Sequence, residues 1–88
     1  MGMTVVKASI LHGRLVSNPS QVVSFRDLER LLSAAGFRLD RITGSHRHYV
    51  HPLVPQVLTV QPDGKEAKRY QVRRLLGIIA QYKLDMNE

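Results

Sequence analysis

The sequence predicts a single α+β domain in which helices cover one face of a three-stranded antiparallel sheet. The expected order is helix, helix, strand, strand, strand, helix. Three observations lead to this prediction. The chain has 88 residues, which is room for one modest hydrophobic core. Apolar residues recur at helical spacing towards both ends of the chain. Between them, three short apolar segments are separated by glycine and proline turns.

The first helix is expected over residues 4–16. Apolar residues recur there at three- and four-residue spacing: Val5, Ala8, Leu11 and Leu15. Gly13 weakens this helix by about 1 kcal/mol relative to alanine. The helix should end at Ser17-Asn18-Pro19, because the residue before a proline is pushed out of the helical conformation.

The second helix is expected over residues 24–35, and its beginning is marked by several signals. Ser24 can cap the helix, and Asp27 lies in its first turn, near the positive end of the helix dipole. Val23 and Leu28 stand at the two positions of a hydrophobic staple. The buried face is expected to consist of Phe25, Leu28, Leu31, Leu32 and Ala35.

The end of the second helix is marked by Gly36, which can adopt the left-handed conformation that follows many helices. Phe37 can then fold back on Leu32, as a Schellman ending requires. Both ends of this helix are therefore predicted from local chemistry.

Three strands are expected to follow, over residues 37–43, 46–52 and 56–61. Gly44-Ser45 should turn the chain between the first two. Prolines at 52 and 55 interrupt pairing and make the second connection a loop. The third strand ends in a turn at residues 61–64, where proline presets φ and glycine accepts positive φ.

The last helix is expected over residues 69–82. Its buried side should consist of Val72, Leu75, Leu76, Ile79 and Tyr82. Arg73 and Arg74 fall mostly outside that stripe.

The chain is strongly basic, with 13 lysine and arginine residues against 7 acidic ones. Between Phe37 and Leu75 there are eight basic and three acidic residues, so five of the six net positive charges lie there. This distribution favours a polyanionic partner over a generally solvated basic surface.

The composition also excludes several classes of protein. There is no cysteine, which excludes disulfides and thiolate metal sites. No apolar run has the length of a membrane span, and the first residues lack the layout of a secretory signal. We therefore expect a soluble cytoplasmic protein that does not associate with membranes.

Three of the four histidines lie in residues 44–52. Histidine can both accept and donate a proton near neutral pH, which suits it to acid–base chemistry. Strand alternation places His46 and His48 on one face, with Val50. It places Arg47, Tyr49 and His51 on the other face.

At this point the sequence resembles the HicA toxins of bacterial and archaeal HicA–HicB toxin–antitoxin pairs. The matching text is Gly36-Phe37, Gly44-Ser45-His46, Tyr49, His51-Pro52, residues 58–62 and residues 68–73. The resemblance implies a fold like the double-stranded-RNA-binding domain. It also implies metal-independent cleavage of mRNA, with no cofactor, and neutralisation by a HicB-like antitoxin.

Within the resemblance, the active histidine of Gly-Ser-His corresponds to His46. The likeness covers a core of residues 24–84, so residues 1–23 form an N-terminal helical extension of the single domain 1–88. Many relatives carry a second histidine where this chain has Arg47. The resemblance therefore leaves a second catalytic group unidentified.

We assign His46 the acid–base role in this expected site. Gly44 and Ser45 form the tight turn that presents it. Arg47, Lys68 and Arg69 are expected to bind phosphate, the last two at the positive N-terminal end of the last helix. Gln71, Arg73 and Arg74 either contact RNA or form an ordinary solvated helix face.

Other interpretations of the same residues stay open. The protein could bind RNA without cutting it, with His46 as a contact residue, or could only dock an acidic partner. His46 and His48 have a spacing that some strand-borne zinc sites use, although a third ligand is missing from the motif. Tyr49 could stack on a base or pack in the core. His48, His51 and His12 are expected to be structural or surface residues.

Overall fold

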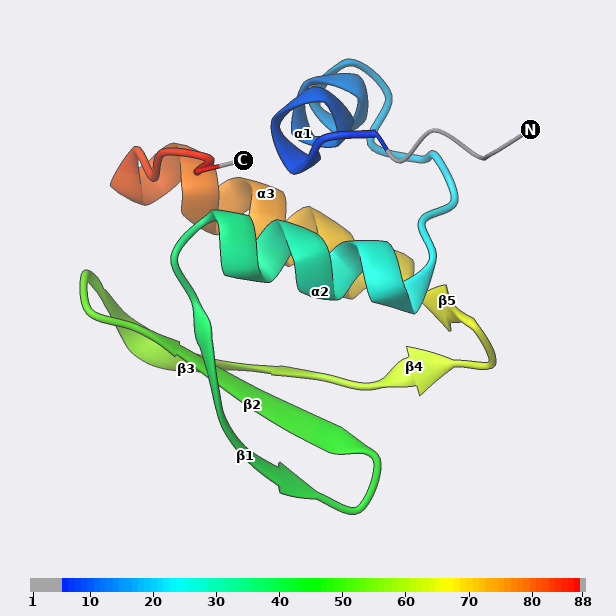
Figure 1. Cartoon of the computed structure of the whole chain (residues 1–88). Coiled ribbons are helices and arrows are strands. Elements are labelled where there is room, and N and C mark those ends of the chain that lie inside the picture. Colours follow the sequence, from blue (N-terminus) through cyan, green and yellow to red (C-terminus); the bar gives the residue numbers. More distant parts are fainter. Residues whose placement is uncertain (1–5, 88) are drawn as a thin grey trace.

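Residues 6–87 fold into three helices and a three-stranded antiparallel sheet, in the predicted order (Figure 1). This is a computed structural model, and it describes residues 6–87. The elements are α1 (Ala8–Ser17), α2 (Phe25–Ala34), β1 (Arg38–Thr43), β2 (His46–His51), β3 (Val54–Val60), β4 (Pro62–Asp63), β5 (Glu66–Ala67) and α3 (Arg69–Tyr82). The predicted α+β class is confirmed, and the β4–β5 hairpin is an addition to it.

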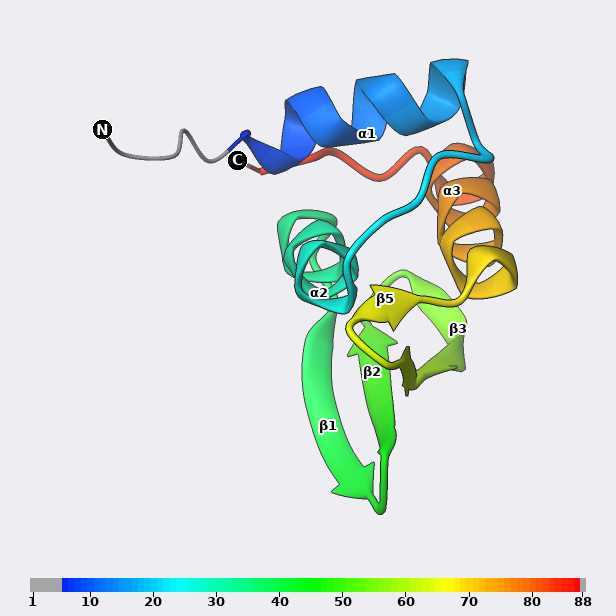
Figure 2. The ribbon, with the colours of Figure 1, turned by 90° about the vertical axis from the view of Figure 1, so that its right-hand side faces the viewer.

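The elements form three layers (Figure 2). The sheet, in the order β1-β2-β3, lies on one side and is covered by α2 and α3. Helix α1 packs on α2 and α3 and crosses them on the side away from the sheet. The N-terminal helix therefore extends the helical layer and leaves the other face of the sheet open.

Helix α1 begins later than predicted. Residues 4 and 5 of the expected start lie outside the described residues, and Lys7 is extended, with φ −60° and ψ 146°. The carbonyl oxygen of Val6 accepts a hydrogen bond from the guanidinium of Arg30 on α2, which holds this segment away from a helical path. The predicted end is confirmed, since the last helical residue is Ser17.

Helix α2 has both of its predicted caps. The Ser24 hydroxyl accepts a hydrogen bond of 3.0 Å from the Asp27 amide. At the other end Gly36 has φ +98°, and the Phe37 amide donates to the Leu32 carbonyl at 2.9 Å. The Gly36 amide donates to the Ser33 carbonyl, which completes a Schellman motif.

The β1–β2 hairpin closes through the predicted two-residue turn, which pairs Thr43 with His46. Gly44 has φ +62° at the first central position, as in type II′ hairpin turns. A β-bulge at Asp40 shifts the register, so that Arg41 pairs with His48 while Leu39 pairs with Tyr49.

The third strand starts two residues earlier than predicted. Val54 already pairs with His51, because Pro52 and Leu53 alone make the turn. Pro55 lies inside this strand, and the position is tolerated because β3 is at an edge of the sheet. After β3, the chain reverses at Gly64 and Lys65, between β4 and β5.

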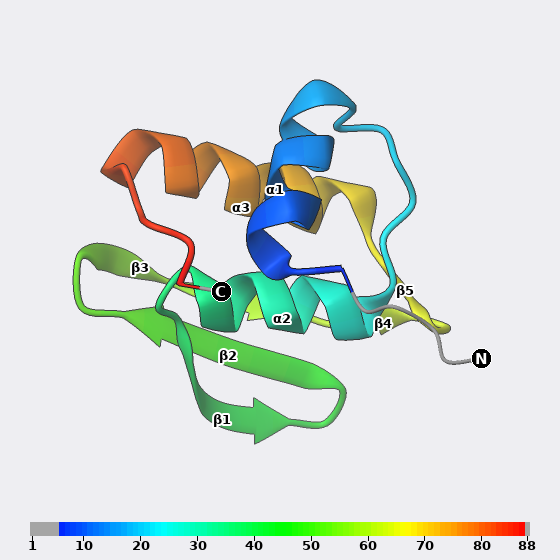
Figure 3. The same cartoon turned by 45° about the horizontal axis from the view of Figure 1, so that its top comes forward.

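The core lies between the sheet and the helices and continues between α1 and the pair formed by α2 and α3. Its largest fully buried side chains are Leu15, Leu28, Leu31, Leu32, Leu58, Leu75, Val60 and Val72. All six residues of β1 are exposed, so β2 and β3 supply the sheet's share of the core. The segment after α3 returns to the end of α2, where the Asn87 amide donates to the Ala34 carbonyl (Figure 3).

The buried side of α3 differs in part from the prediction. Val72, Leu75 and Ile79 are buried as expected, whereas Leu76 and Tyr82 are only half-buried. Gln71 and Ile78 are buried in addition. The buried stripe is rotated because α3 packs against both β3 and α1.

Among residues 6–87, no helix is long and apolar enough to cross a membrane.

Candidate functional site

Strand β2 presents its side chains to two different environments, as alternation predicted. Arg47 and Tyr49 point towards α2, where both contact Glu29. His46 and His48 therefore project from the opposite, open face of the sheet.

His46 is exposed and is the first residue of β2. The β1–β2 hairpin projects away from the helices, so its turn lies at the free end of the sheet (Figures 1 and 2). The imidazole at this position is open to solvent and to a large ligand.

His48 lies on the same face and is fixed from both sides. Its Nε2 is hydrogen-bonded to Thr43 Oγ1 on β1 at 2.7 Å, and its Nδ1 to Thr59 Oγ1 on β3 at 2.9 Å. The ring therefore joins all three strands of the sheet. The sequence predicts a surface or core histidine, and the structure places it in a half-buried position beside His46.

Arg41 is a residue that the sequence analysis did not assign to the site. It pairs with His48 across the β1–β2 ladder, which places an exposed guanidinium group on the open face. The signal was available: a two-residue turn at Gly44-Ser45 pairs Thr43 with His46, and counting two residues along each strand pairs Arg41 with His48. The same face carries Arg38, whose ladder partner is Val50.

Arg47 is separated from His46 by the sheet. Its guanidinium donates to Glu29 Oε2 at 2.6 Å and lies over the Phe25 ring, 5.4 Å from the centroid. The predicted phosphate-binding role therefore does not fit this conformation, since the side chain is already paired with a carboxylate under the sheet.

Tyr49 belongs to the core, with 6% of its surface exposed. Its hydroxyl donates to the same Glu29 Oε2 atom at 2.7 Å. Burial, followed by the hydrogen bond to Glu29 and the charge of that residue, raises the pKa of Tyr49 above its ordinary value. Of the two roles that the sequence left open, the structure favours core packing over stacking on a base.

The raised pKa makes a testable prediction about stability. Above pH 10, the ordinary tyrosine value, the unfolded chain loses the Tyr49 proton while the folded protein keeps it. The contribution of Tyr49 to the free energy of unfolding is therefore complete below that pH and declines as the pH rises. Tyr49→Phe should cost about 1.5–3 kcal/mol at pH 7, because it removes a hydrogen bond to a charged group.

Urea unfolding of both proteins across the alkaline range measures this difference. The difference in the free energy of unfolding between the wild type and Tyr49→Phe should become smaller above pH 10. A difference that stays constant or becomes larger as the pH rises would show that the fold does not hold the Tyr49 hydroxyl in its protonated form.

His51 has a structural position. Its Nδ1 accepts a hydrogen bond from the Leu53 amide at 3.0 Å, so Nε2 carries the proton and donates to the Ala35 carbonyl at 2.9 Å. The ring also meets Phe37 edge-on, with centroids 5.0 Å apart. This histidine connects the β2–β3 turn to the end of α2, in agreement with its expected structural role.

The predicted phosphate ligands on α3 form a separate surface. Arg69 and Arg73 are exposed and Lys68 is half-buried, at and just after the start of the helix. This start lies beside β5, whereas the turn that carries His46 projects away from the helices (Figure 2). The structure thus divides the predicted site into a histidine face and a helical basic surface.

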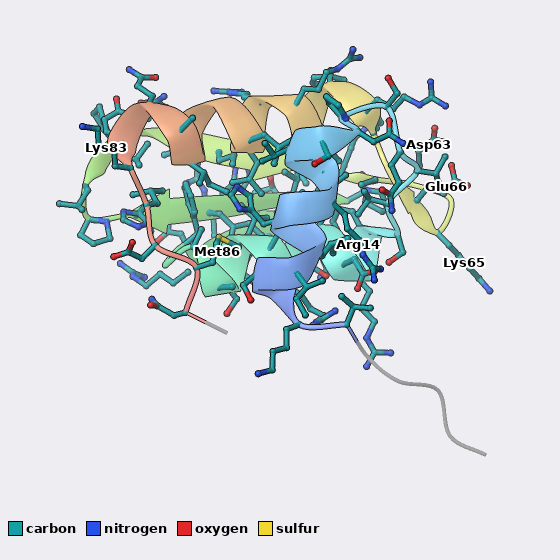
Figure 4. All side chains as sticks on the ribbon, turned by 90° about the horizontal axis from the view of Figure 1, so that it is seen from above. Arg14, Asp63, Lys65, Glu66, Lys83 and Met86 are labelled. Atoms are coloured by element: carbon teal, nitrogen blue, oxygen red, sulfur yellow. The ribbon has the colours of Figure 1, made fainter. Side chains whose placement is uncertain are left out.

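Acidic residues adjoin the start of α3. The β4–β5 hairpin carries Asp63 and Glu66, and Lys65 extends outward from its turn (Figure 4). Lys83 marks the opposite end of the helix (Figure 4). The two carboxylates offset part of the positive charge at this end of the molecule.

Gln71 does not fit its predicted role as an RNA contact. The side chain is 4% exposed, its Oε1 accepts from the Gln61 amide at 3.4 Å, and its Nε2 donates to the Tyr70 hydroxyl at 3.3 Å. Both ends of the amide are used inside the protein, because the buried stripe of α3 is rotated towards this residue.

The zinc alternative gains no third ligand from the fold. Within the described part of the chain, no group of three histidine, cysteine, aspartate or glutamate residues has the geometry to hold a metal ion. Both ring nitrogens of His48 are engaged by threonine hydroxyls.

The fold and the site define a small basic α+β protein with an accessible histidine on an open sheet face. The family described as the HicA toxin of bacterial toxin–antitoxin systems matches residues 25–81. This match spans more than half of the chain, and the protein belongs to the HicA toxin family. Comparisons with curated proteins and with solved structures gave no significant match.

Proposed function

We propose that this toxin is an endoribonuclease that cuts mRNA without a metal ion, with His46 as an acid–base group. The observation that carries the proposal is the position of His46, exposed at the free end of a sheet face that also holds Arg38 and Arg41. An accessible imidazole among cations has the properties needed to bind a phosphodiester and transfer a proton beside it.

The chemistry requires three contributions. One group removes the proton from the ribose 2′-hydroxyl, fixed positive charge stabilises the phosphorane-like transition state, and the leaving 5′-oxygen gains a proton. A positioned acid–base group typically contributes about 10²–10⁴-fold in rate. Cations aimed at the developing charge contribute further.

The cation next to the reacting phosphate is assigned to Arg41 in this proposal. It replaces Arg47, which lies under the sheet in an ion pair with Glu29. Gly44 and Ser45 keep their proposed role as the turn that presents His46. Lys68, Arg69 and Arg73 are left to hold RNA farther from the cut, and Gln71 is withdrawn because it is buried.

The proposed partners are single-stranded mRNA in the cytoplasm and a HicB-like antitoxin. The family is one of toxin–antitoxin systems, which supports an antitoxin partner. A chain with a formal net charge of +6 would attract an acidic antitoxin as well as RNA. Residues 24–84 would form the toxin core and α1 an extension of it.

Incubation of the purified protein with single-stranded RNA in EDTA tests the activity. We expect cleavage that leaves 2′,3′-cyclic or 2′/3′-phosphate ends and 5′-hydroxyl ends. A single 2′-deoxy substitution at a mapped cleavage position should abolish the cut there, because the nucleophile is missing.

Other results would point to other functions. Intact RNA with a salt-sensitive gel shift would indicate a noncatalytic RNA-binding module. RNA that is neither cut nor bound would indicate a protein that only docks its antitoxin. Cleavage that EDTA abolishes and zinc restores would contradict the metal-independent mechanism.

A further inference from the structure

The open face of the sheet holds a second histidine, His48, that has no role in the proposed reaction as described above. His46 and His48 are two residues apart on β2 and project from the same face, with Cα atoms about 6.6 Å apart. The exposed hydroxyl of Thr43 lies opposite His46 in the ladder and is hydrogen-bonded to His48 Nε2, so the His46 ring and the hydroxyl linked to His48 face the same bound phosphodiester.

The His48 ring is held in a way that tolerates both of its protonation states. Its two nitrogens are hydrogen-bonded to the hydroxyls of Thr43 and Thr59, at 2.7 and 2.9 Å. A hydroxyl can donate or accept, so neither bond has to be lost when the ring gains or releases a proton. A carbonyl or an amide in either position would favour one state over the other.

The surroundings of His48 suit an anionic substrate. Arg41 faces it across the β1–β2 ladder, and His46 is its neighbour on β2. Asp40, at the bulge, lies 3.9 Å from the guanidinium of Arg38. The charges of Glu29 and Arg47 lie on the other side of the sheet. A bound phosphate would therefore offset the positive charge that faces the ring.

We infer that His48 is the second proton-transfer group of this site and acts as its general acid through the hydroxyl of Thr43. The inference rests on the proposed ribonuclease function. Both ring nitrogens are engaged by threonine hydroxyls, so the proton passes through the exposed Thr43 hydroxyl, which accepts from Nε2–H and can itself donate to the leaving oxygen.

The two histidines then divide the reaction between them. His46 takes the 2′-hydroxyl proton as the bond from O2′ to phosphorus forms. His48 gives its Nε2 proton to the Thr43 hydroxyl, which gives its own proton to O5′ as the bond from phosphorus to O5′ breaks. The products are a 2′,3′-cyclic phosphate and a 5′-hydroxyl, and the two rings exchange protons with water to return to their starting states.

The test uses His48→Gln, whose amide keeps a donor and an acceptor for the two threonines but cannot transfer a proton. Single-turnover cleavage is measured on an oligoribonucleotide with one mapped cleavage position, and on the same oligonucleotide with sulfur in place of O5′ there. A thiolate leaves without a proton. We expect a rate loss of about 10²-fold or more on ordinary RNA and a rate near that of the wild type on the sulfur substrate.

RNA affinity and thermal unfolding of His48→Gln are measured alongside and should match the wild type. If this variant does not fold, His48→Thr takes its place, since threonine is well suited to a strand. Equal losses on both substrates, or no loss on ordinary RNA, overturn the inference while cleavage by the wild type still supports the proposed function. A wild-type protein that leaves RNA intact overturns both.

Discussion

Replacement of His46 by alanine should reduce RNA cleavage by about 10²–10⁴-fold and abolish growth arrest in cells that express the protein. The loss follows from removal of the proposed base at the free end of the sheet. The fold should be unchanged, because the side chain is exposed and follows a turn that Gly44 stabilises through its positive φ.

A matched control variant distinguishes the loss of the His46 imidazole from the effect of removing any histidine side chain from the protein. His12 lies on α1, outside the residues that match the family, and is half-buried. His12→Ala should therefore cleave RNA at the wild-type rate. Both variants are compared by single-turnover cleavage, RNA affinity and circular dichroism.

The variant also distinguishes between the functions left open by the sequence. His46→Ala that retains full cleavage and toxicity would show that the acid–base assignment is wrong. A loss of RNA affinity equal to the loss of cleavage would instead make His46 a contact residue, as in a noncatalytic RNA-binding module. Catalysis predicts that affinity is largely retained.

The sequence predicted the parts of the fold whose signals are local. Both caps of α2 follow from Ser24 and Gly36, because each satisfies backbone groups a few residues away. The start of α1 was predicted too early, since the Val6 carbonyl is held by Arg30 from a distant helix. No periodicity within residues 4–16 carries that information.

The two faces of β2 were also predictable, but not which face the helices cover. Alternation grouped Tyr49 with Arg47, and the pairing of both with Glu29 depends on where α2 crosses the sheet. That crossing is a tertiary property. Without it, the position of Arg47 next to His46 in the sequence favours Arg47 as the phosphate ligand, although the turn register points to Arg41.

The burial of Gln71 had a weak signal in the sequence. Gln71, Leu75 and Ile78 follow helical spacing, as do Val72, Leu75 and Ile79, so α3 has two overlapping stripes. The choice between them depends on α1 and β3, which pack against different sides of the helix. Polarity alone placed the glutamine on the surface.

The second large effect is expected for Gly36→Ala, which should lower the free energy of unfolding by about 2–5 kcal/mol. Gly36 has φ +98°, a conformation that costs a residue with a Cβ about 1–2 kcal/mol. A Cβ there would also lie 2.8 Å from His51 Nε2. The ring cannot move away without losing its hydrogen bond to the Ala35 carbonyl.

Two comparisons distinguish the backbone strain at residue 36 from the steric clash between an added Cβ and the His51 ring. Gly64 has φ +62° with no atom within 4 Å of an added Cβ, so Gly64→Ala measures the backbone cost alone and should be the milder change. In a double-mutant cycle, the His51→Ala background should reduce the cost of Gly36→Ala to about that of Gly64→Ala. Additive costs in chemical unfolding would mean that His51 does not restrict this position.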